Sequence, residues 1–90
     1  MNICVVSSFE GDVKEFMSMV AEFDEEFKEA ASDFEFGVVN TGKEGVSKII
    51  TIANIINEER FQEIMSSSKM IEWDKAHNNT DVIYSIEKIS

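Results

Sequence analysis

The feature that most constrains this chain is a long amphipathic segment in its first third. Apolar residues recur there at spacings of three and four: Val13, Phe16, Met17, Val20, Phe23, Phe27, Ala30 and Ala31. Glutamates fill many of the positions between them, so the pattern predicts a helix of about five turns with one apolar and one acidic face. Asp12 followed by Glu15 forms a capping-box pattern, which predicts that the helix begins here.

Four further segments have the composition of β-strands. Residues 3–6 form a β-prone apolar run, which predicts a central strand covered on both faces and ended by residues 7–11. Residues 34–39 alternate, with the two phenylalanines on one face. Residues 46–55 form a long β-branched strand, and residues 82–89 alternate as a fourth strand.

A second helical region lies between the third and fourth strands. Asn57 is suited to cap its start, and three apolar residues, Phe61, Ile64 and Met65, face inward. Residues 66–68 are all serine and interrupt the pattern, which Trp73 and His77 resume before it ends at Asn78 and Asn79. The region is predicted to be two short helices or one kinked helix.

The order strand, helix, strand, strand, helix, strand predicts an α+β ferredoxin-like fold (βαββαβ), with two helices on one face of a four-stranded antiparallel sheet. Ninety residues provide one domain, which we expect to span residues 1–90. The apolar strand residues on the other face of the sheet must be covered by something else. A homodimer formed through that face is the simplest expectation.

Charge restricts the partners. The formal net charge is −10, and residues 10–35 alone hold ten acidic residues and two lysines, a net of −8. Because lysine and arginine provide most of the affinity for phosphate backbones, we expect neither nucleic acid nor an anionic membrane as partner. The acidic face of the first helix could instead bind a basic protein. The chain has neither a secretory signal pattern nor a membrane-length apolar run, so a cytoplasmic location is expected.

Common cofactor and metal motifs are absent from the sequence. One cysteine and one histidine are too few for a structural zinc site, and Cys4 is expected to be buried and unreactive. Residues 37–43 match a phosphate-binding loop, but Glu44 replaces the final Ser or Thr and a strand follows, which favours a hairpin turn. We therefore expect no metal and no cofactor.

The element order, together with the stretch FQEIMSSSKMIEW at residues 61–73, His77 and the last strand, resembles the dimeric α+β barrel superfamily. That superfamily includes antibiotic-biosynthesis-type monooxygenases, haem-degrading oxygenases and stress-response proteins. The stretch looks most like an uncharacterised family from marine cyanobacteria. Haem-degrading members use an Asn on the first strand with a Trp and a His from the second helical region. Here Trp73 and His77 match, while Asn2 lies outside the expected active face.

Three functional hypotheses follow. The first is a small homodimeric binding or regulatory protein, whose ligand is an apolar small molecule or a protein partner, with Trp73, Phe36 and Tyr84 as ligand-binding candidates. The second is a cofactor-independent monooxygenase or haem-handling enzyme with His77 as catalytic base or ligand and Trp73 lining the pocket. The alternative role of His77 is to complement the dipole at a helix end. The third is an acidic regulator that docks a basic protein through the first helix.

Overall fold

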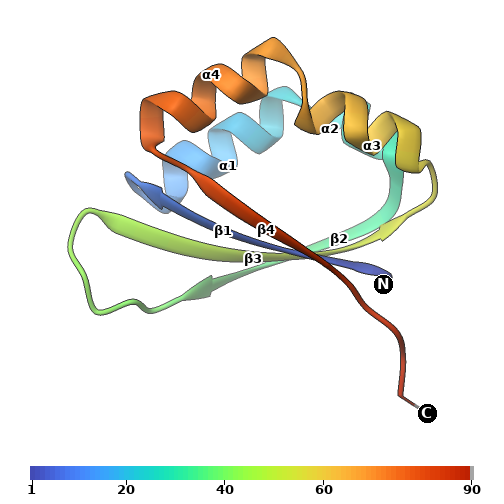
Figure 1. Ribbon diagram of the computed structural model, residues 1–90, viewed down its shortest axis with the longest axis horizontal. Coiled ribbons are helices and arrows are strands. Elements are labelled where there is room, and N and C mark those ends of the chain that lie inside the picture. Colours follow the sequence, from blue (N-terminus) through green and yellow to red (C-terminus); the bar gives the residue numbers. More distant parts are fainter. Residues whose placement is uncertain (90) are drawn as a thin grey trace.

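The computed structural model describes residues 1–89 as a four-stranded antiparallel sheet with four helices on one face (Figure 1). The elements in chain order are β1 (Ile3–Glu10), α1 (Val13–Glu22), α2 (Asp24–Ala30), β2 (Ala31–Val39), β3 (Val46–Ile55), α3 (Glu58–Met65), α4 (Ser68–His77) and β4 (Thr80–Ser85). The strands lie in the order β2-β3-β1-β4. This is the ferredoxin-like arrangement predicted from the sequence.

β1 is longer than its apolar run indicates, so the predicted break at residues 7–11 is wrong. Ser7 pairs with Ile49 of β3 on one side and with Asp81 of β4 on the other. Two residues later, Phe9 is 2% exposed and belongs to the core. Hydrogen bonding from two neighbouring strands therefore carries β1 through a polar stretch that local propensity assigns to a loop.

The first helical region begins as predicted but does not continue as one helix. Asp12 Oδ1 accepts from the backbone N–H of Glu15 at 2.9 Å, and the Asp12 N–H donates to Glu15 Oε2 at 2.8 Å, which completes the capping box. The helix then breaks at Phe23, whose N–H donates to the carbonyl of Val20. Three acidic residues, at positions 24–26, form the first turn of α2. Their negative charges stabilise the N-terminus of this helix by interacting with the helix dipole.

The second helical region is two helices, and its predicted boundaries are confirmed. The Asn57 side chain caps α3 through the Arg60 N–H, and Ser67 caps α4. Asn78 ends α4 in the left-handed conformation with φ of 49°. β4 follows at Thr80–Ser85 rather than at residues 82–89, because it pairs only with β1, which offers no partner beyond its first residues.

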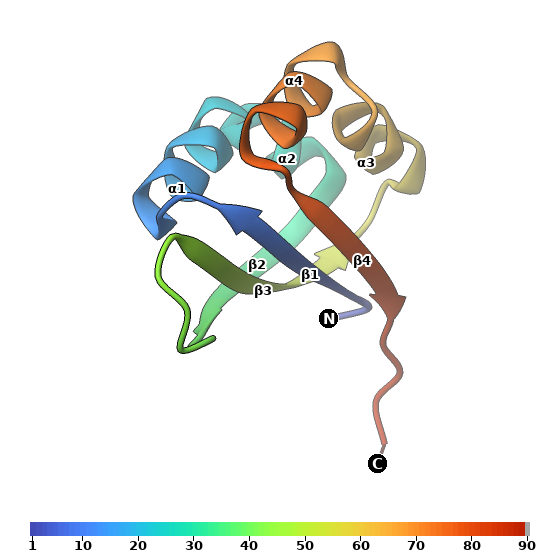
Figure 2. The same ribbon diagram turned by 60° about the vertical axis from the view of Figure 1, so that its left-hand side comes forward.

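The sheet has one face covered by helices and one open face, and successive strand residues point to the two faces in turn. The covered face packs against the helices and holds the core, including Val5, Phe9, Ile49 and Ala53. In the described part of the chain, residues 1–89, no helix lies against the opposite face (Figure 2). The expectation that β1 is covered on both faces is therefore wrong within one protomer. Cys4, expected to be buried, lies half-exposed on the open face.

The two edges of the sheet differ. β2 is nine residues long and has a register shift between Ala31 and Asp33 where it pairs with β3, which is a β-bulge or a similar irregularity. β4 is six residues long. The connection between β2 and β3 is a loop at residues 40–45, followed by a strand and not a helix, as the hairpin prediction requires. Within residues 1–89, no helix is long and apolar enough to cross a membrane.

Candidate functional site

A cavity of about 50 Å³ lies between the helices and the covered face of the sheet. All eight elements or their ends contribute to its wall, which is almost entirely apolar. Its apolar lining includes five phenylalanines and three methionines, namely Phe16, Phe27, Phe34, Phe36, Phe61, Met19, Met65 and Met70. The polar lining residues are Ser7, Thr51, Asn79 and Asp81. The arrangement is therefore an apolar cavity with a few polar side chains, which is the usual composition of a small-molecule site.

Three of these polar residues form a connected cluster where β1 meets β4. The Ser7 hydroxyl, on a side chain that is 3% exposed, donates to Asp81 Oδ1 at 2.6 Å. The Asn79 amide nitrogen donates to the same Asp81 oxygen at 3.0 Å and to Asp74 Oδ1 at 2.9 Å. The remaining Asn79 atom, Oδ1, is buried and has no hydrogen-bond partner among residues 1–89.

Asp74 lies behind this cluster, at the end of α4. Partial burial raises the pKa of its carboxyl group, and the nearby charge of Asp81 raises the pKa further. The hydrogen bond from the Asn79 amide lowers the pKa and so opposes the other two effects. Asn79 therefore separates two carboxylates that repel each other.

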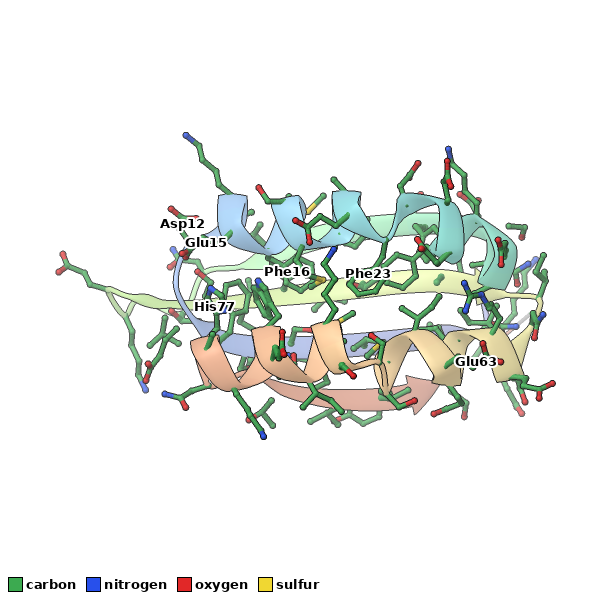
Figure 3. All side chains as sticks on the ribbon, turned by 90° about the horizontal axis from the view of Figure 1, so that it is seen from above. Asp12, Glu15, Phe16, Phe23, Glu63 and His77 are labelled. Carbon is green, nitrogen blue, oxygen red and sulfur yellow. The ribbon has the colours of Figure 1, made fainter. Side chains whose placement is uncertain are left out.

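His77 is placed at the junction of α1 and α4 and not in the cavity wall (Figure 3). Its Nδ1 lies 2.9 Å from the Trp73 carbonyl oxygen, which can only accept, so Nδ1 carries a proton in this geometry. Its Nε2 lies 3.7 Å from Glu15 Oε1, and its ring stacks on Trp73 with centroids 4.0 Å apart. These contacts suit a histidine that fixes a helix C-terminus.

The three ligand-binding candidates lie in different places. Phe36 lines the cavity and meets the Phe16 ring edge-on at 6.3 Å. Trp73 packs against Phe9 and Phe16 at centroid distances of 5.3 and 6.0 Å, within the core beside the cavity. Tyr84 is 54% exposed and lies on the open face of the sheet. The structure therefore brings only Phe36, of the four predicted site residues, to the cavity wall.

The cluster of Ser7, Asn79 and Asp81 was not predicted from the sequence. Ser7 was assigned to a break after the first strand, and Asn79 to the end of the second helical region. Asp81 lies just before the residue at which the fourth strand was expected to begin. Ser7 and Asp81 are 74 positions apart in the chain, and only the pairing of β1 with β4 brings them together.

A second hollow is a wide groove of about 710 Å³ where the chain leaves β4 and passes α3. Its floor includes Ile55 and Phe61, and three glutamates, Glu58, Glu59 and Glu87, lie along it. It lacks the enclosing aromatic wall of the cavity. Among residues 1–89, no three His, Cys, Asp or Glu side chains converge in a way that could hold a metal ion.

Comparisons with solved structures identify proteins of the same fold. An antibiotic biosynthesis monooxygenase aligns over 100% of both chains, with a TM-score of 0.64 and 7% identity. A variant of SnoaB, a cofactor-independent oxygenase from Streptomyces nogalater, aligns over 98% of this chain and 95% of its own, with a TM-score of 0.58 and 14% identity. A hydroxynitrile lyase from Passiflora edulis aligns over 98% and 96%, with a TM-score of 0.51 and 12% identity.

These similarities confirm the predicted ferredoxin-like α+β fold. No protein-family model matches the sequence, and no curated protein is significantly similar to it. The similar structures include an oxygenase and a lyase, so the shared fold does not specify a reaction. Function must be argued from the residues of the site.

Proposed function

We propose that this chain is the protomer of a homodimer that binds a small apolar molecule in the cavity between its helices and its sheet. The observation that carries the proposal is the cavity itself, an apolar space that includes a small connected polar cluster in its wall. Its present volume of about 50 Å³ is small for an organic ligand. Three of its lining side chains are the flexible methionines Met19, Met65 and Met70, which can repack around a ligand.

The homodimer is supported by the open face of the sheet. Apolar side chains gather there on three neighbouring strands, namely Val6, Ile50, Ile52, Val82 and Tyr84. Val82 and Tyr84, on the edge strand β4, are 43% and 54% exposed and extend this apolar surface. Most of the acidic residues of positions 10–35 lie on α1 and α2, on the other side of the sheet from this face. In a dimer formed through the open face, the acidic residues of the two protomers are therefore kept apart, which reduces their electrostatic repulsion.

The dimer is tested by placing a charge on the open face. Ile50→Lys puts an ammonium group at the centre of the proposed interface, and we expect the dimer dissociation constant in sedimentation velocity to rise at least about tenfold. Ile56→Lys is the matched control, because Ile56 is 63% exposed and lies outside the strands. A wild-type chain that sediments as a monomer at high micromolar concentration contradicts the dimer.

Ligand binding is tested by filling the cavity. Ala53 lines it from β3 and is 2% exposed, so Ala53→Leu places a larger side chain in the space. Hexan-1-ol serves as the probe, followed by the fluorescence of Trp73, the only tryptophan of the chain. We expect Ala53→Leu to weaken hexan-1-ol binding at least about tenfold, because the leucine side chain occupies the space that the ligand needs. Ala76→Leu on the exposed side of α4 is the control. Equal affinity in all three proteins contradicts the proposal.

The oxygenase or haem-handling alternative has less support from the geometry. It needs His77 at the cavity wall, whereas the His77 ring contacts Trp73 and Glu15. A catalytic role for His77 stays a prediction. It is tested by absorbance titration of haem into the wild type and into His77→Gln, which keeps a side-chain donor near the Trp73 carbonyl. Haem binding that His77→Gln abolishes would favour the enzyme.

The acidic-regulator alternative concerns the outer face of α1 and α2. Part of its charge is already paired: Glu22 with Lys69 at 3.0 Å, Asp24 with Lys28 at 2.9 Å, and Glu29 with Arg60 at 2.9 Å. These exposed pairs are weak and do not prevent a basic partner from competing for the acids. A complex with such a partner would lose affinity steeply as salt is added.

A further inference from the structure

The orientation of the Asn79 amide is fixed by its surroundings. One side of the group lies 2.9 and 3.0 Å from the carboxylate oxygens of Asp74 and Asp81. Carboxylates accept hydrogen bonds, so the atom that faces both must be the NH₂ group, which has two protons to donate. The amide oxygen Oδ1 is thereby directed away from both carboxylates.

That oxygen is buried and receives no hydrogen bond from residues 1–89. Buried polar atoms without partners are rare in folded proteins, and each one calls for an explanation such as a water or a ligand. Asn79 contributes to the wall of the cavity, which has room for a small group beside it. A group bound in the cavity therefore lies against Asn79 and can supply the donor that its Oδ1 lacks.

The other two members of the cluster, Ser7 and Asp81, also have only acceptor atoms left for a ligand. The Ser7 hydroxyl uses its proton on Asp81 Oδ1, and Asp81 retains its second carboxylate oxygen, for which no partner is found within residues 1–89. The lining residues include no lysine or arginine. A ligand carboxylate or phosphate placed here would meet a negative charge and no compensating cation.

We infer that the polar cluster of Ser7, Asn79 and Asp81 selects a ligand with an apolar body and a terminal hydrogen-bond donor, an alcohol or a primary ammonium group, and rejects carboxylates. The inference rests on the proposed ligand-binding function and adds the chemical class of ligand to it. The donor satisfies Asn79 Oδ1, the Asp81 carboxylate accepts a second hydrogen bond, and the apolar body lies among the phenylalanines and methionines.

Four probes of nearly equal size separate these effects. Hexan-1-ol and pentyl methyl ether are isomers that differ in having or lacking a donor, and hexylamine and hexanoate add a charge of either sign. Binding to the 90-residue chain is followed at pH 7 by NMR chemical shifts and Trp73 fluorescence. We expect the alcohol to bind about fivefold more tightly than the ether, which corresponds to one hydrogen bond, and hexanoate to bind at least about tenfold more weakly than the alcohol.

Two isosteric variants assign the preference to the cluster. Asp81→Asn keeps an acceptor for Ser7 but removes the negative charge that favours an ammonium group. The affinity for hexylamine relative to that for hexan-1-ol should therefore fall about tenfold. Glu72→Gln makes the same change at an exposed residue of α4 outside the cavity wall and should leave the ranking unchanged. Asn79→Ala removes the unpaired acceptor and should equalise the alcohol and the ether. If this variant does not fold, the comparison of Asp81→Asn with Glu72→Gln decides.

The outcomes separate this inference from the proposed function. Equal affinities for the alcohol and the ether, or tightest binding of hexanoate, overturn the donor preference while leaving an apolar binding site in place. A crystal structure that retains only a water at Asn79 Oδ1 in the presence of hexan-1-ol overturns it as well. Failure of all four probes to bind refutes the proposed function, and the donor preference with it.

Discussion

Replacing Gly11 with alanine should destabilise the fold more than the same change at any other glycine tested. Gly11 has φ of +131°, a conformation that residues with a Cβ atom rarely adopt. A Cβ there would overlap Glu15 Oε2 and lie 3.3 Å from His77 Cδ2. The backbone cannot relax easily, because the Gly11 N–H donates to the Gly45 carbonyl and the Gly11 carbonyl accepts from Ser47.

The magnitude follows from two contributions. A non-glycine residue held at such a φ costs about 1–3 kcal/mol, and moving the Glu15 carboxylate away breaks one half of the capping box, at about 1 kcal/mol. The expected loss is therefore about 2–4 kcal/mol, out of the roughly 5–13 kcal/mol available to a domain of this size. Such a loss corresponds to a fall in Tm of about 8–30 °C.

The assay is urea unfolding followed by circular dichroism, with two other glycines as graded controls. Gly42 has φ of +70° but open space around it, so Gly42→Ala should lose only about 1–2 kcal/mol. Gly37 has neither a positive φ nor a neighbour within 4 Å, so Gly37→Ala should be nearly neutral. The reasoning is refuted if Gly11→Ala unfolds at the same urea concentration as Gly37→Ala.

Three other predictions concern the core, the caps and pH. Phe9→Ala should lower the free energy of unfolding by about 3–5 kcal/mol, because the Phe9 ring is 2% exposed and stacks on Phe16; urea unfolding measures this, and a loss below 1 kcal/mol would contradict it. Asn57→Ala should cost about 1 kcal/mol through the loss of the α3 cap, whereas Gln62→Ala, at an exposed position of the same helix, serves as a surface control. Asp74→Asn should be more stable than the wild type at pH 7, because the raised pKa of Asp74 means that its ionised form is disfavoured by folding. That advantage should shrink as the pH falls through about 4, where the carboxyl group is protonated in both states; unfolding curves at pH 7 and pH 3 test it, and an advantage that grows on acidification would contradict it.

The parts of the fold that were predictable have signals confined to a few neighbouring residues. The capping box at Asp12 and Glu15, the cap at Asn57 and the helix break at residues 66–68 each depend on side chains within four positions. The alternation of residues 46–55 puts Ile49 and Ala53 on one face of β3, and in the structure both side chains are buried in the core.

The parts that were not predictable depend on partners far away in the chain. β1 extends through Ser7 because β3 and β4 supply hydrogen bonds, and β4 ends early because β1 ends. The break at Phe23 has only a weak local signal in the three acids that follow it. Of the candidate site, Phe36 was identified from its strand, but the polar cluster could not be, since it exists only when β1 and β4 are paired.

The unequal edges of the sheet bear on how this protein avoids self-association into fibres. An edge strand presents unpaired backbone groups that can accept a strand from another molecule. On β2, the irregularity near Ala31 and the acidic side chains of Asp33 and Glu35 hinder pairing with a strand of another molecule. β4 has only six residues with which such a strand could pair. Growth of the sheet beyond four strands is thereby discouraged at both ends, which leaves the open face as the surface through which copies can associate without polymerising.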